Sequence, residues 1–338
     1  MGRSGRDARG LTLRDIAHAA NVSVGAVSQA LNNTGALNPD TRARIRSIAD
    51  ELGYVPNQFA AALRRRRSMA IGFVTASSGE QNARHWASAH GTQLSALVRA
   101  AADIGYSVTV LPDDRPELVA SSQVDAIYVP DAMTGDLVVA AAETAQIPIV
   151  TNDATRRHER SIYVNIGIAE ATRFALEQLV AGGSQRPALL TGPVTAESAE
   201  GEQAYLVWCD QHEIAPIIGS GCTDQDQLEQ TAIEVVRSGA DSIFSLAAQG
   251  PNILIGLSRD GVVLPRDLQL IALCIDECSV NQRLDIGHIC VHPEHAPALA
   301  LTAVLEALSS DGNATREITV PWEFHAGATV RPAQRNRA

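Results

Sequence analysis

Apolar residues near the start of the chain recur at the spacing of amphipathic helices, and short polar turns separate them. The pattern predicts helices over 13–20 and 24–31, joined by three residues, and a third helix from Pro39 to Leu52. Two helices joined by so short a turn are typical of a helix-turn-helix. The residues expected to share one small core are Ile16, Ala20, Val22, Val27, Leu31, Ile45, Ile48, Ala49 and Leu52.

Polar residues stand where these helices should begin and end. Thr12 fits the N-cap of the first helix, with Asp15 three residues later as in a capping box. Ser23 can cap the second helix and Asn38 the third, while Gly53 is typical of a residue that ends a helix. The local signals and the apolar pattern therefore predict the same three helices.

From residue 69 onward, strand-like runs alternate with helical ones. The strand-like runs are 71–75, 106–111, 126–129, 147–151, 188–191, 242–246 and 269–272, and the helical patterns cover 87–104, 169–180, 228–237 and 252–259. Such alternation favours parallel sheets covered by helices. The rhythm runs twice and changes over near 164–167, which predicts two doubly wound α/β lobes with a ligand cleft between them.

These patterns divide the chain into four parts. Residues 1–10 read as a basic flexible arm, 11–55 as the helix-turn-helix domain, 56–68 as a short alanine-rich helix with a linker, and 69–338 as the body. The segment 56–68 is too short to be a stable helix alone, so it either folds on a partner or stays a solvated linker. Within the body we expect lobes at about 69–164 and 165–290, with chain crossings near 290 and 320.

Charge is distributed very unevenly along the chain. All 27 basic residues are arginine. Residues 1–68 hold 11 arginines and five acidic residues, a net charge of +6, whereas residues 69–338 hold 16 arginines and 33 acidic residues, a net charge of −17. A small basic head on an acidic body indicates that only the head meets a polyanion such as nucleic acid. A basic disordered arm is the alternative interpretation of the same charges.

Composition excludes several classes of protein. The longest apolar runs, such as 137–142, are far too short to cross a membrane, and the polar N-terminus lacks a signal sequence, so we expect a cytoplasmic protein. Five cysteines form no disulfide framework. Cys274 and Cys278 are four residues apart without a second pair, so we expect buried thiols rather than structural zinc.

The sequence offers no catalytic constellation. No nucleophile elbow, phosphate-binding loop or paired metal-protease histidines occur. His288, His292 and His295 are the nearest cluster of histidines, but their spacing on an expected strand does not favour a metal site. We therefore expect a protein that is not an enzyme and carries neither a metal nor a cofactor.

Several residue runs together resemble the lactose-repressor (LacI) family of bacterial transcription regulators. The matching runs are 11–17, 21–23, 27–32, 41–42, 51–57, Ala60, Leu63 and 71–72, and looser matches follow at 147–150, Asp153, 189–193 and 264–267. The resemblance implies a multidomain protein with an all-α helix-turn-helix head and an α/β body like a periplasmic binding protein. It also implies a homodimer that binds a pseudo-palindromic operator and a small effector in the interlobe cleft.

The resemblance assigns DNA contacts to the head. The residues expected to contact base edges are Val24, Gly25 and Gln29, with Ala26 next to them on the same helix. The residues whose short polar side chains suit phosphate oxygens are Thr12, Ser23, Ser28, Asn32, Asn38 and Thr41. Those in or leading into a hinge helix are Tyr54, Asn57, Ala60, Leu63 and Arg64. Within that helix, Leu63 matches a leucine wedged into the minor groove, and the arginines from Arg64 would lie near phosphates.

Gln29 departs from the family pattern, because most members have arginine at this position. Arginine forms a bidentate pair with guanine, whereas glutamine suits adenine. We therefore expect an altered base preference at this half-site position. The alternative is that Gln29 contacts only water or backbone.

The body departs further from the family pattern. Glu202 stands where an effector-gripping arginine is frequent, Ala247 and Ala248 replace an Asn-Asp pair, and Cys274 and Ile275 replace paired aspartates. The remaining candidates for effector binding are Trp86, Asp153, Ser198, Glu202 and Asp276, with Trp208 as a second stacking face. An isolated tryptophan or aspartate more often lies in the core or at the surface. The exchange of charge makes a cationic or apolar effector, or none, more plausible than an anionic one.

Three interpretations of the whole chain follow. The favoured one is a dimeric DNA-binding repressor whose affinity for its operator depends on an effector in the cleft. A second keeps the DNA-binding head but makes the body a ligand-silent scaffold for dimerisation or protein docking. A third, a solute-binding protein with an incidental basic arm, lacks an export signal to support it.

Overall fold

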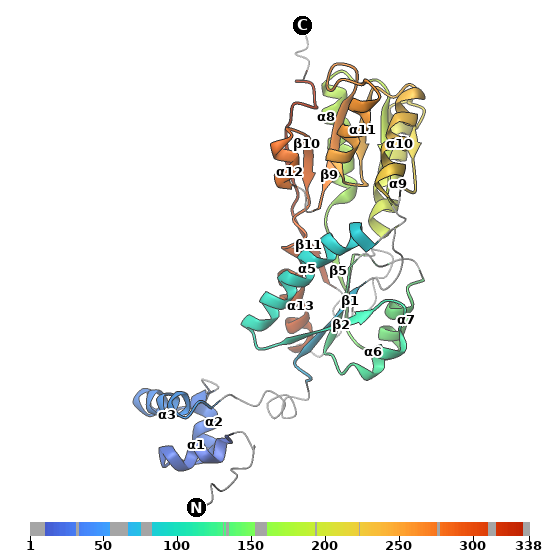
Figure 1. Cartoon of the computed structure of the whole chain (residues 1–338). Coiled ribbons are helices and arrows are strands. Elements are labelled where there is room, and N and C mark those ends of the chain that lie inside the picture. The colour runs from blue at the N-terminus through green and yellow to red at the C-terminus, as the bar shows by residue number, and fades with distance from the viewer. Residues whose placement is uncertain are drawn as a thin grey trace, which may run out of the picture. The chain divides into compact units, whose positions relative to one another are not determined.

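A computed structural model describes residues 11–31, 34–54, 67–75, 83–130, 132, 135–152, 161–192, 195–222, 224–275, 278–309 and 316–333. The chain forms two compact units, Met1–Arg66 and Arg67–Ala338, here called the head and the body (Figure 1). Each is described by itself.

The described residues of the head form three helices around one core. They are α1 (Leu13–Ala20), α2 (Val24–Leu31) and α3 (Pro39–Glu51). The buried core residues are Ile16, Ala17, Ala20, Val27, Ala30, Ile45 and Ala49. The prediction for Leu52 was wrong: α3 ends at Glu51, and the Leu52 side chain is 42% exposed. Tyr54 packs against the core instead.

Side chains at the helix starts accept or exchange the expected hydrogen bonds. The Asp15 carboxylate accepts from both the backbone N–H and the hydroxyl of Thr12, at 2.7 Å each. These bonds lower the pKa of Asp15. The Ser23 hydroxyl oxygen accepts from the Ala26 N–H at 3.1 Å, which fixes the first turn of α2.

Two arginines of α3 bind the ends of the other two helices. Arg44 Nη1 donates to the Ala20 carbonyl at 2.9 Å, and Arg46 Nε donates to the Ala30 carbonyl at 3.1 Å. The last carbonyls of a helix have no partner inside it, and a cation is favoured at that end of the helix dipole. These two guanidinium groups therefore hold α1 and α2 against α3.

Arg42 binds the loop that follows α2. Its guanidinium donates to the backbone oxygens of Gln29, Thr34 and Gly35, at 3.1, 3.3 and 3.1 Å. Arg42 therefore orders the backbone after α2, while its charge still contributes to the net charge of +6 of residues 1–68.

The body is built on two sheets with the same strand order. The first sheet runs β2 (Ser107–Pro112), β1 (Ala70–Thr75), β3 (Ala126–Val129), β4 (Ile149–Thr151), β5 (Ser161–Asn165), β11 (Arg316–Thr319). The second runs β7 (Ile218–Gly219), β6 (Pro187–Leu190), β8 (Ser242–Ser245), β9 (Gln269–Cys274), β10 (Gly287–Cys290), β12 (Glu323–His325). All these neighbours pair in parallel except β10 and β12.

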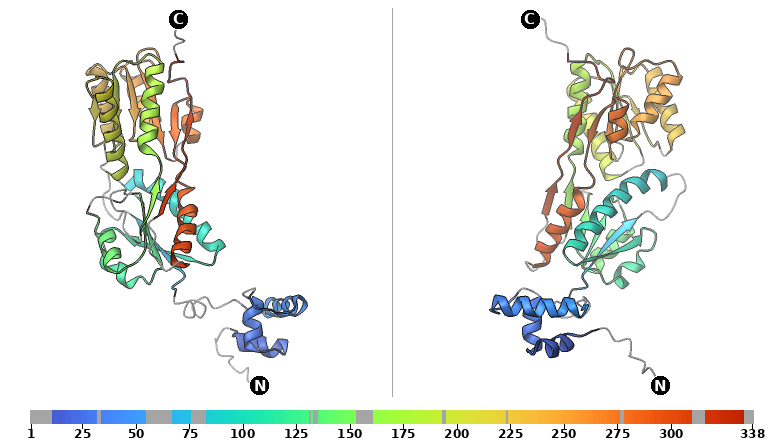
Figure 2. Two further views of the ribbon diagram at one scale, coloured as in Figure 1. Left: turned by 180° about the vertical axis from the view of Figure 1, so that it is seen from behind. Right: turned by 60° about the vertical axis from the view of Figure 1, so that its left-hand side comes forward.

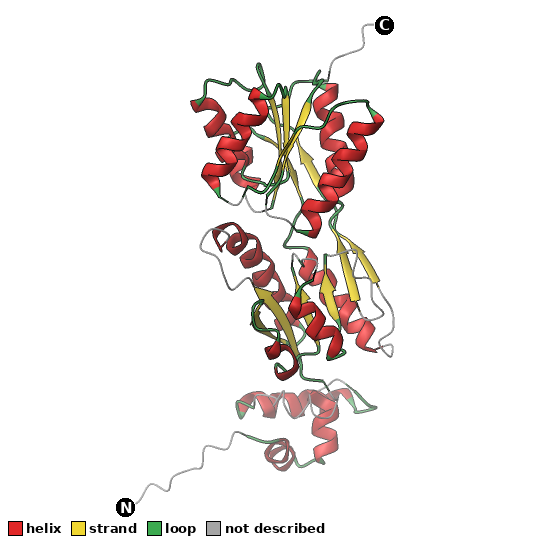
Figure 3. Ribbon diagram, turned by 90° about the vertical axis from the view of Figure 1, so that its right-hand side faces the viewer, coloured by secondary structure: helices red, strands yellow, loops and turns green. Residues whose placement is uncertain are grey.

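Helices lie on both faces of each sheet (Figure 3). The first sheet is accompanied by α5 (Ala83–Asp103), α6 (Glu117–Ser121), α7 (Leu137–Thr144) and α13 (Ala296–Ser309). The second is accompanied by α8 (Ile168–Ala181), α9 (Ala196–Gln211), α10 (Gln225–Arg237), α11 (Gly250–Arg259) and α12 (Cys278–Arg283). Because strand side chains alternate between faces, Phe73 and Val74 belong to the two different cores of the first sheet.

The chain passes between the two lobes three times (Figure 2). It passes after β5 through 166–167, after β10 through 291–295, and after β11 through 320–322. Through the second crossing the chain returns to the first lobe, where α13 joins the core of the first sheet. Among the described helices, none is long and apolar enough to cross a membrane.

Replacing Arg44 should loosen the head. Arg44→Ala leaves the Ala20 carbonyl without its charged donor, and hydrogen bonds that involve a charged group contribute about 1.5–3 kcal/mol. We expect faster hydrogen exchange of the α1 and α3 amides in the full chain. Arg14→Ala, on the exposed side of α1, removes the same charge without removing a described hydrogen bond. Equal exchange in the two variants would contradict a structural role for Arg44.

Candidate nucleic-acid interface and interlobe pocket

The exposed side of α2 carries no charge. Val24 is 41% exposed, and Gly25 and Gln29 are exposed too, while Val27 and Ala30 face the core. Ala26 and Ser28 are half-buried. A base-reading surface here would therefore rely on shape, one amide and short polar groups, with no cationic side chain of α2 itself.

The short polar residues expected at phosphates first serve the helices of the head. Thr12, Ser23 and Asn38 are exposed, and each takes part in a helix start; Asn38 Oδ1 accepts from the Asp40 N–H at 2.8 Å. The Ser23 hydroxyl proton and the Asn38 amide nitrogen are not used in these caps. Those two groups can donate to an oxyanion while the caps stay formed. Thr41 and Tyr54 are half-buried.

Gln29 lies over the loop after α2. A Cβ built on Gly35 would stand 2.6 Å from Gln29 Cδ, and Gly35 has a positive φ of 70°. The backbone conformation favours glycine here, and a larger residue would also displace the end of the Gln29 side chain. For Gln29 to reach a base edge, its side chain has to turn away from Gly35.

Several predicted site residues lie outside the described residues. In the head and its linker these are Asn32, Asn57, Ala60, Leu63 and Arg64, and in the body they are Asp153 and Asp276. Trp86 belongs to α5, but its side chain is not described. Their functional roles stay predictions.

A pocket lies between the two lobes of the body, at the carboxyl ends of strands from both sheets. Its volume is about 960 Å³, counting the part open to solvent. Its lining is mostly apolar, from Val129 and Val164 on one side to Leu246 and Leu273 on the other. The polar lining residues are Gln93, Tyr128, Thr151, Asn152, Thr195, Glu197 and Ser198.

A hydrogen bond connects the two lobes inside this pocket. Asn152, which follows β4 in the first lobe, donates through Nδ2 to Glu197 Oε1 of α9 in the second lobe, at 2.6 Å. Asn152 Oδ1 accepts from the Ala132 N–H at 3.1 Å, which orients the amide. Because a carboxylate acceptor strengthens a hydrogen bond, this contact favours the observed lobe arrangement.

The pocket contains one of the predicted effector residues and leaves out another. Ser198 lines it, but its hydroxyl exchanges hydrogen bonds with the backbone of Thr195 at the start of α9. Glu202 is half-buried one turn further along α9 and does not belong to the lining. Glu197, five residues earlier on α9, is the glutamate of this helix that lines the pocket.

Two other residues of the second lobe that the sequence analysis singled out are Trp208 and Ala247. Trp208 is 2% exposed and belongs to the core of the second lobe, so it is not a stacking face for a ligand. Ala247 lines the pocket with a methyl group. Sequence reasoning missed Asn152, although its place directly after an expected strand was a usable signal.

Comparison with known proteins places the head in a described family. The model for bacterial regulatory proteins, lacI family, matches residues 12–57. The chain is 23% identical over 290 residues to catabolite control protein A of Staphylococcus epidermidis, covering 78% of this chain and 82% of that protein. It is 28% identical over 222 residues to the lactose operon repressor of Escherichia coli, covering 61% and 58%.

Solved structures share the fold of the whole chain. The Lac repressor dimer bound to operator and the anti-inducer ONPF matches with a TM-score of 0.73 at 19% identity, covering 95% of this chain and 99% of that chain. The complex of the transcriptional regulator CelR with cellobiose matches with a TM-score of 0.68 at 19% identity, covering 94% and 99%. The expected fold, a helix-turn-helix head and a body of two α/β lobes, is confirmed.

Breaking the bond between Asn152 and Glu197 should open the body. Asn152→Asp places two carboxylates where a donor met an acceptor, and we expect their repulsion to increase the radius of gyration measured by small-angle scattering. Asn165→Asp is the matched control, because Asn165 also donates to a glutamate, Glu317, at 2.9 Å, but within one lobe. An unchanged radius in Asn152→Asp, or an equal increase in both variants, would contradict a closing role for the cross-lobe bond.

Proposed function

We propose that the chain, whose residues 12–57 match the lacI family of bacterial regulatory proteins, is a sequence-specific DNA-binding transcriptional regulator of that family. We propose further that it acts as a repressor, binding a pseudo-palindromic operator as a homodimer. The observation that carries the proposal is the match of the family model to 12–57, together with three helices in a helix-turn-helix arrangement. The relatives named above are regulators rather than enzymes.

In this proposal α2 is the recognition helix. Its exposed residues Val24, Gly25 and Gln29 would meet base edges in the major groove, with Ala26 beside them. Ser23 and Asn38 would donate to phosphates through the hydrogens that their caps leave over. The other proposed contacts are Thr12, Ser28, Thr41 and Tyr54 in the described head, and Asn32, Asn57, Ala60, Leu63 and Arg64 outside it.

The interlobe pocket would bind a small effector. Glu197 is the charged side chain among the described lining residues, and most of its neighbours are apolar. An anion would meet this carboxylate at a cost, so the effector class is an apolar or cationic molecule that carries hydrogen-bond donors. Such a ligand would compete with Asn152 for Glu197 and so change lobe closure, which would move the DNA-binding segments of a dimer.

The same contact also favours a second candidate function. Asn152 donates to Glu197 across the pocket, so the charged side chain of the described lining already has a protein partner. A body closed in this way could serve as a ligand-silent scaffold for dimerisation or for docking another protein. In either case the protein would act on chromosomal DNA, and we place it in the bacterial cytoplasm.

Selection from a pool of randomised duplexes tests the DNA-binding proposal directly. The full chain should enrich a two-fold symmetric site, and the affinity for that site should fall steeply as salt rises, because phosphate contacts release counterions. A chain lacking residues 1–68 should enrich nothing. Enrichment without symmetry would argue against the dimer, and no enrichment by the full chain would overturn the proposed function.

The same selection experiment tests whether Gln29 contacts a base. We expect Gln29→Arg to shift the preferred base at one position of each half-site toward guanine, with discrimination of about 1–3 kcal/mol. Ser47→Arg, on the exposed side of α3, adds the same charge away from α2. An unchanged site in Gln29→Arg would mean that Gln29 stays over Gly35 on the DNA and reads no base.

A further inference from the structure

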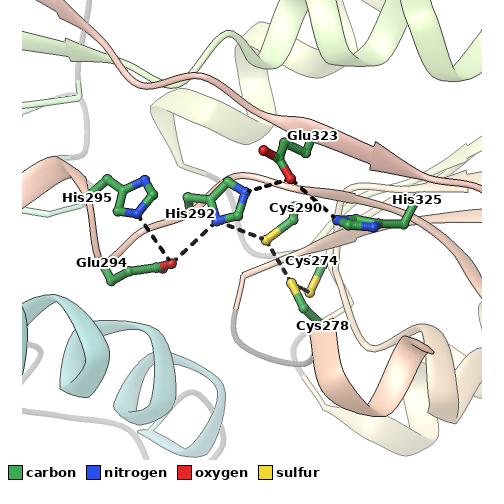
Figure 4. A network of polar contacts seen from close by, with 8 residues as sticks. All are labelled: Cys274, Cys278, Cys290, His292, Glu294, His295, Glu323 and His325. Atoms are coloured by element: carbon green, nitrogen blue, oxygen red, sulfur yellow. Dashed lines mark hydrogen bonds and ion pairs between the residues drawn. The ribbon is translucent and has the colours of Figure 1, made fainter. Parts of the chain in front are cut away.

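Three cysteines from separate elements meet at one edge of the second sheet (Figure 4). Cys274 ends β9 and Cys290 ends β10, and the two residues are direct partners in the parallel register. Cys278 begins α12 and lies between them, with its sulfur 2.6 Å from that of Cys274 and 2.7 Å from that of Cys290. In the sequence only Cys274 and Cys278 are near one another, and the pairing of β9 with β10 brings Cys290 to them.

His292 faces this group of sulfurs. It stands two residues after Cys290 and has a left-handed backbone (φ 47°). Its Nδ1 is 3.7 Å from Cys290 Sγ and 3.3 Å from Glu294 Oε1, so it has to exchange this carboxylate for the ion when a metal binds. The other ring nitrogen, Nε2, is buried and has no hydrogen-bond partner, and it lies 3.7 Å from Glu323 Oε2 on β12. A histidine that binds a metal through one nitrogen usually directs the other toward a carboxylate or carbonyl.

We propose that Cys274, Cys278, Cys290 and His292 form a binding site for one zinc-class metal ion. Three thiolates and one imidazole are a common ligand set for tetrahedral zinc, and soft sulfur ligands select against Mg²⁺ and Ca²⁺. The fourth position is filled by His292, so the site is closed and structural in type. Neither the DNA-binding head nor the effector pocket uses these side chains.

The geometry fits this ion after two movements. The three thiols already form one group, whereas His292 groups with Glu294 and His295, so its ring has to turn toward Cys274 and Cys278. Zinc bonds of ~2.3 Å to sulfur and ~2.0 Å to nitrogen put the two ligand atoms ~3.6 Å apart in a tetrahedron, close to the observed distance between Cys290 and His292. Two sulfurs on one zinc lie ~3.8 Å apart, so the thiols have to spread by ~1 Å when the ion enters. Cys278 is half-buried, unlike Cys274 and Cys290, and so has the most room to move.

The location gives the ion a mechanical role. The neighbours of the ligands, Leu273 and Ile275 beside Cys274, and Val291 and Pro293 beside His292, line the interlobe pocket. The segment 291–295 is also the second crossing between the lobes. An ion held here would tie β9, α12 and that crossing together, and so stabilise the folded body by binding it and not the unfolded chain.

Metal titration of the full, reduced chain tests the site. We expect one Zn²⁺ per chain in competition with a colorimetric chelator, and a rise in melting temperature on Zn²⁺ addition. Co²⁺ should give intense ligand-field and sulfur-to-metal bands typical of tetrahedral coordination. Cys278→Ser and Cys290→Ser should lose the bands and the rise in melting temperature, and His292→Ala should shift the Co²⁺ spectrum.

Matched controls keep the result interpretable if a variant is unstable. Cys209→Ser and Cys222→Ser alter buried thiols elsewhere in the second lobe and should keep full Zn²⁺ binding. Glu294→Gln removes a carboxylate that contacts His292 Nδ1 at 3.3 Å, and Zn²⁺ binding should persist there because the three thiols remain. Circular dichroism checks the fold of each variant.

Three outcomes would overturn the proposal. The first is a reduced, folded chain that binds no Zn²⁺. The second is Zn²⁺ binding that survives Cys278→Ser but is lost in Glu294→Gln, which would assign the ion to the exposed cluster. The third is an intact mass that lacks two hydrogen atoms until a reductant is added, together with no Zn²⁺ binding after reduction, which would make the cluster a disulfide pair with a spare thiol.

Discussion

Parallel strand pairing is the constraint on which the rest of the body depends. Because all strands of a parallel sheet end at the same edge, each lobe gathers its strand-end loops on one side, and the pocket lies where those sides meet. Asn152 follows β4 and Leu273 lies near the end of β9, and both reach the pocket for this reason. The same rule brings Cys274 and Cys290 together on neighbouring strands. One backbone pattern therefore produces both candidate sites of the body.

The head depends on a different interaction, the satisfaction of helix ends by side chains. A core of seven buried residues is small, so the caps at Thr12, Ser23 and Asn38 matter for holding three short helices. Arginines of α3 complete the other ends of α1 and α2. Some of the polar residues proposed to contact DNA phosphates are thus the same residues that cap the helices of the head. A contact made by a cap residue is positioned before any nucleic acid arrives.

Local signals predicted what local forces determine. The bounds of α1 and α2 were predicted to the residue because capping residues and apolar spacing agreed, and the strand Ala126–Val129 was likewise predicted in full. Leu52 was assigned wrongly because helical spacing continues in the sequence after the helix itself has ended. The helix Ala296–Ser309 was missed: it is rich in alanine and leucine on most sides, and its place in the first lobe follows from a crossing that no local pattern reveals.

The candidate sites show the same division. Ser198 could be placed at the cleft by resemblance, whereas the contact between Asn152 and Glu197 joins residues 45 positions apart from two lobes. Glu197 lines the pocket and Glu202, the candidate that the resemblance offered on the same helix, does not. Cys290 joins the thiol cluster through strand register, which pairs it with a residue 16 positions earlier. Contacts of this kind require the assembled sheets.

If the proposed function is right, the arrangement of the two lobes sets the affinity for DNA. The most direct measurement is the dissociation constant of the full chain for its selected duplex, compared between Asn152→Asp, Asn165→Asp and the unaltered protein at one salt concentration. Coupling of the size usual for allosteric proteins predicts a change of about 5-fold or more in Asn152→Asp, and none in Asn165→Asp. Equal dissociation constants in all three, with the body of Asn152→Asp opened in solution, would show that the lobes do not control the head.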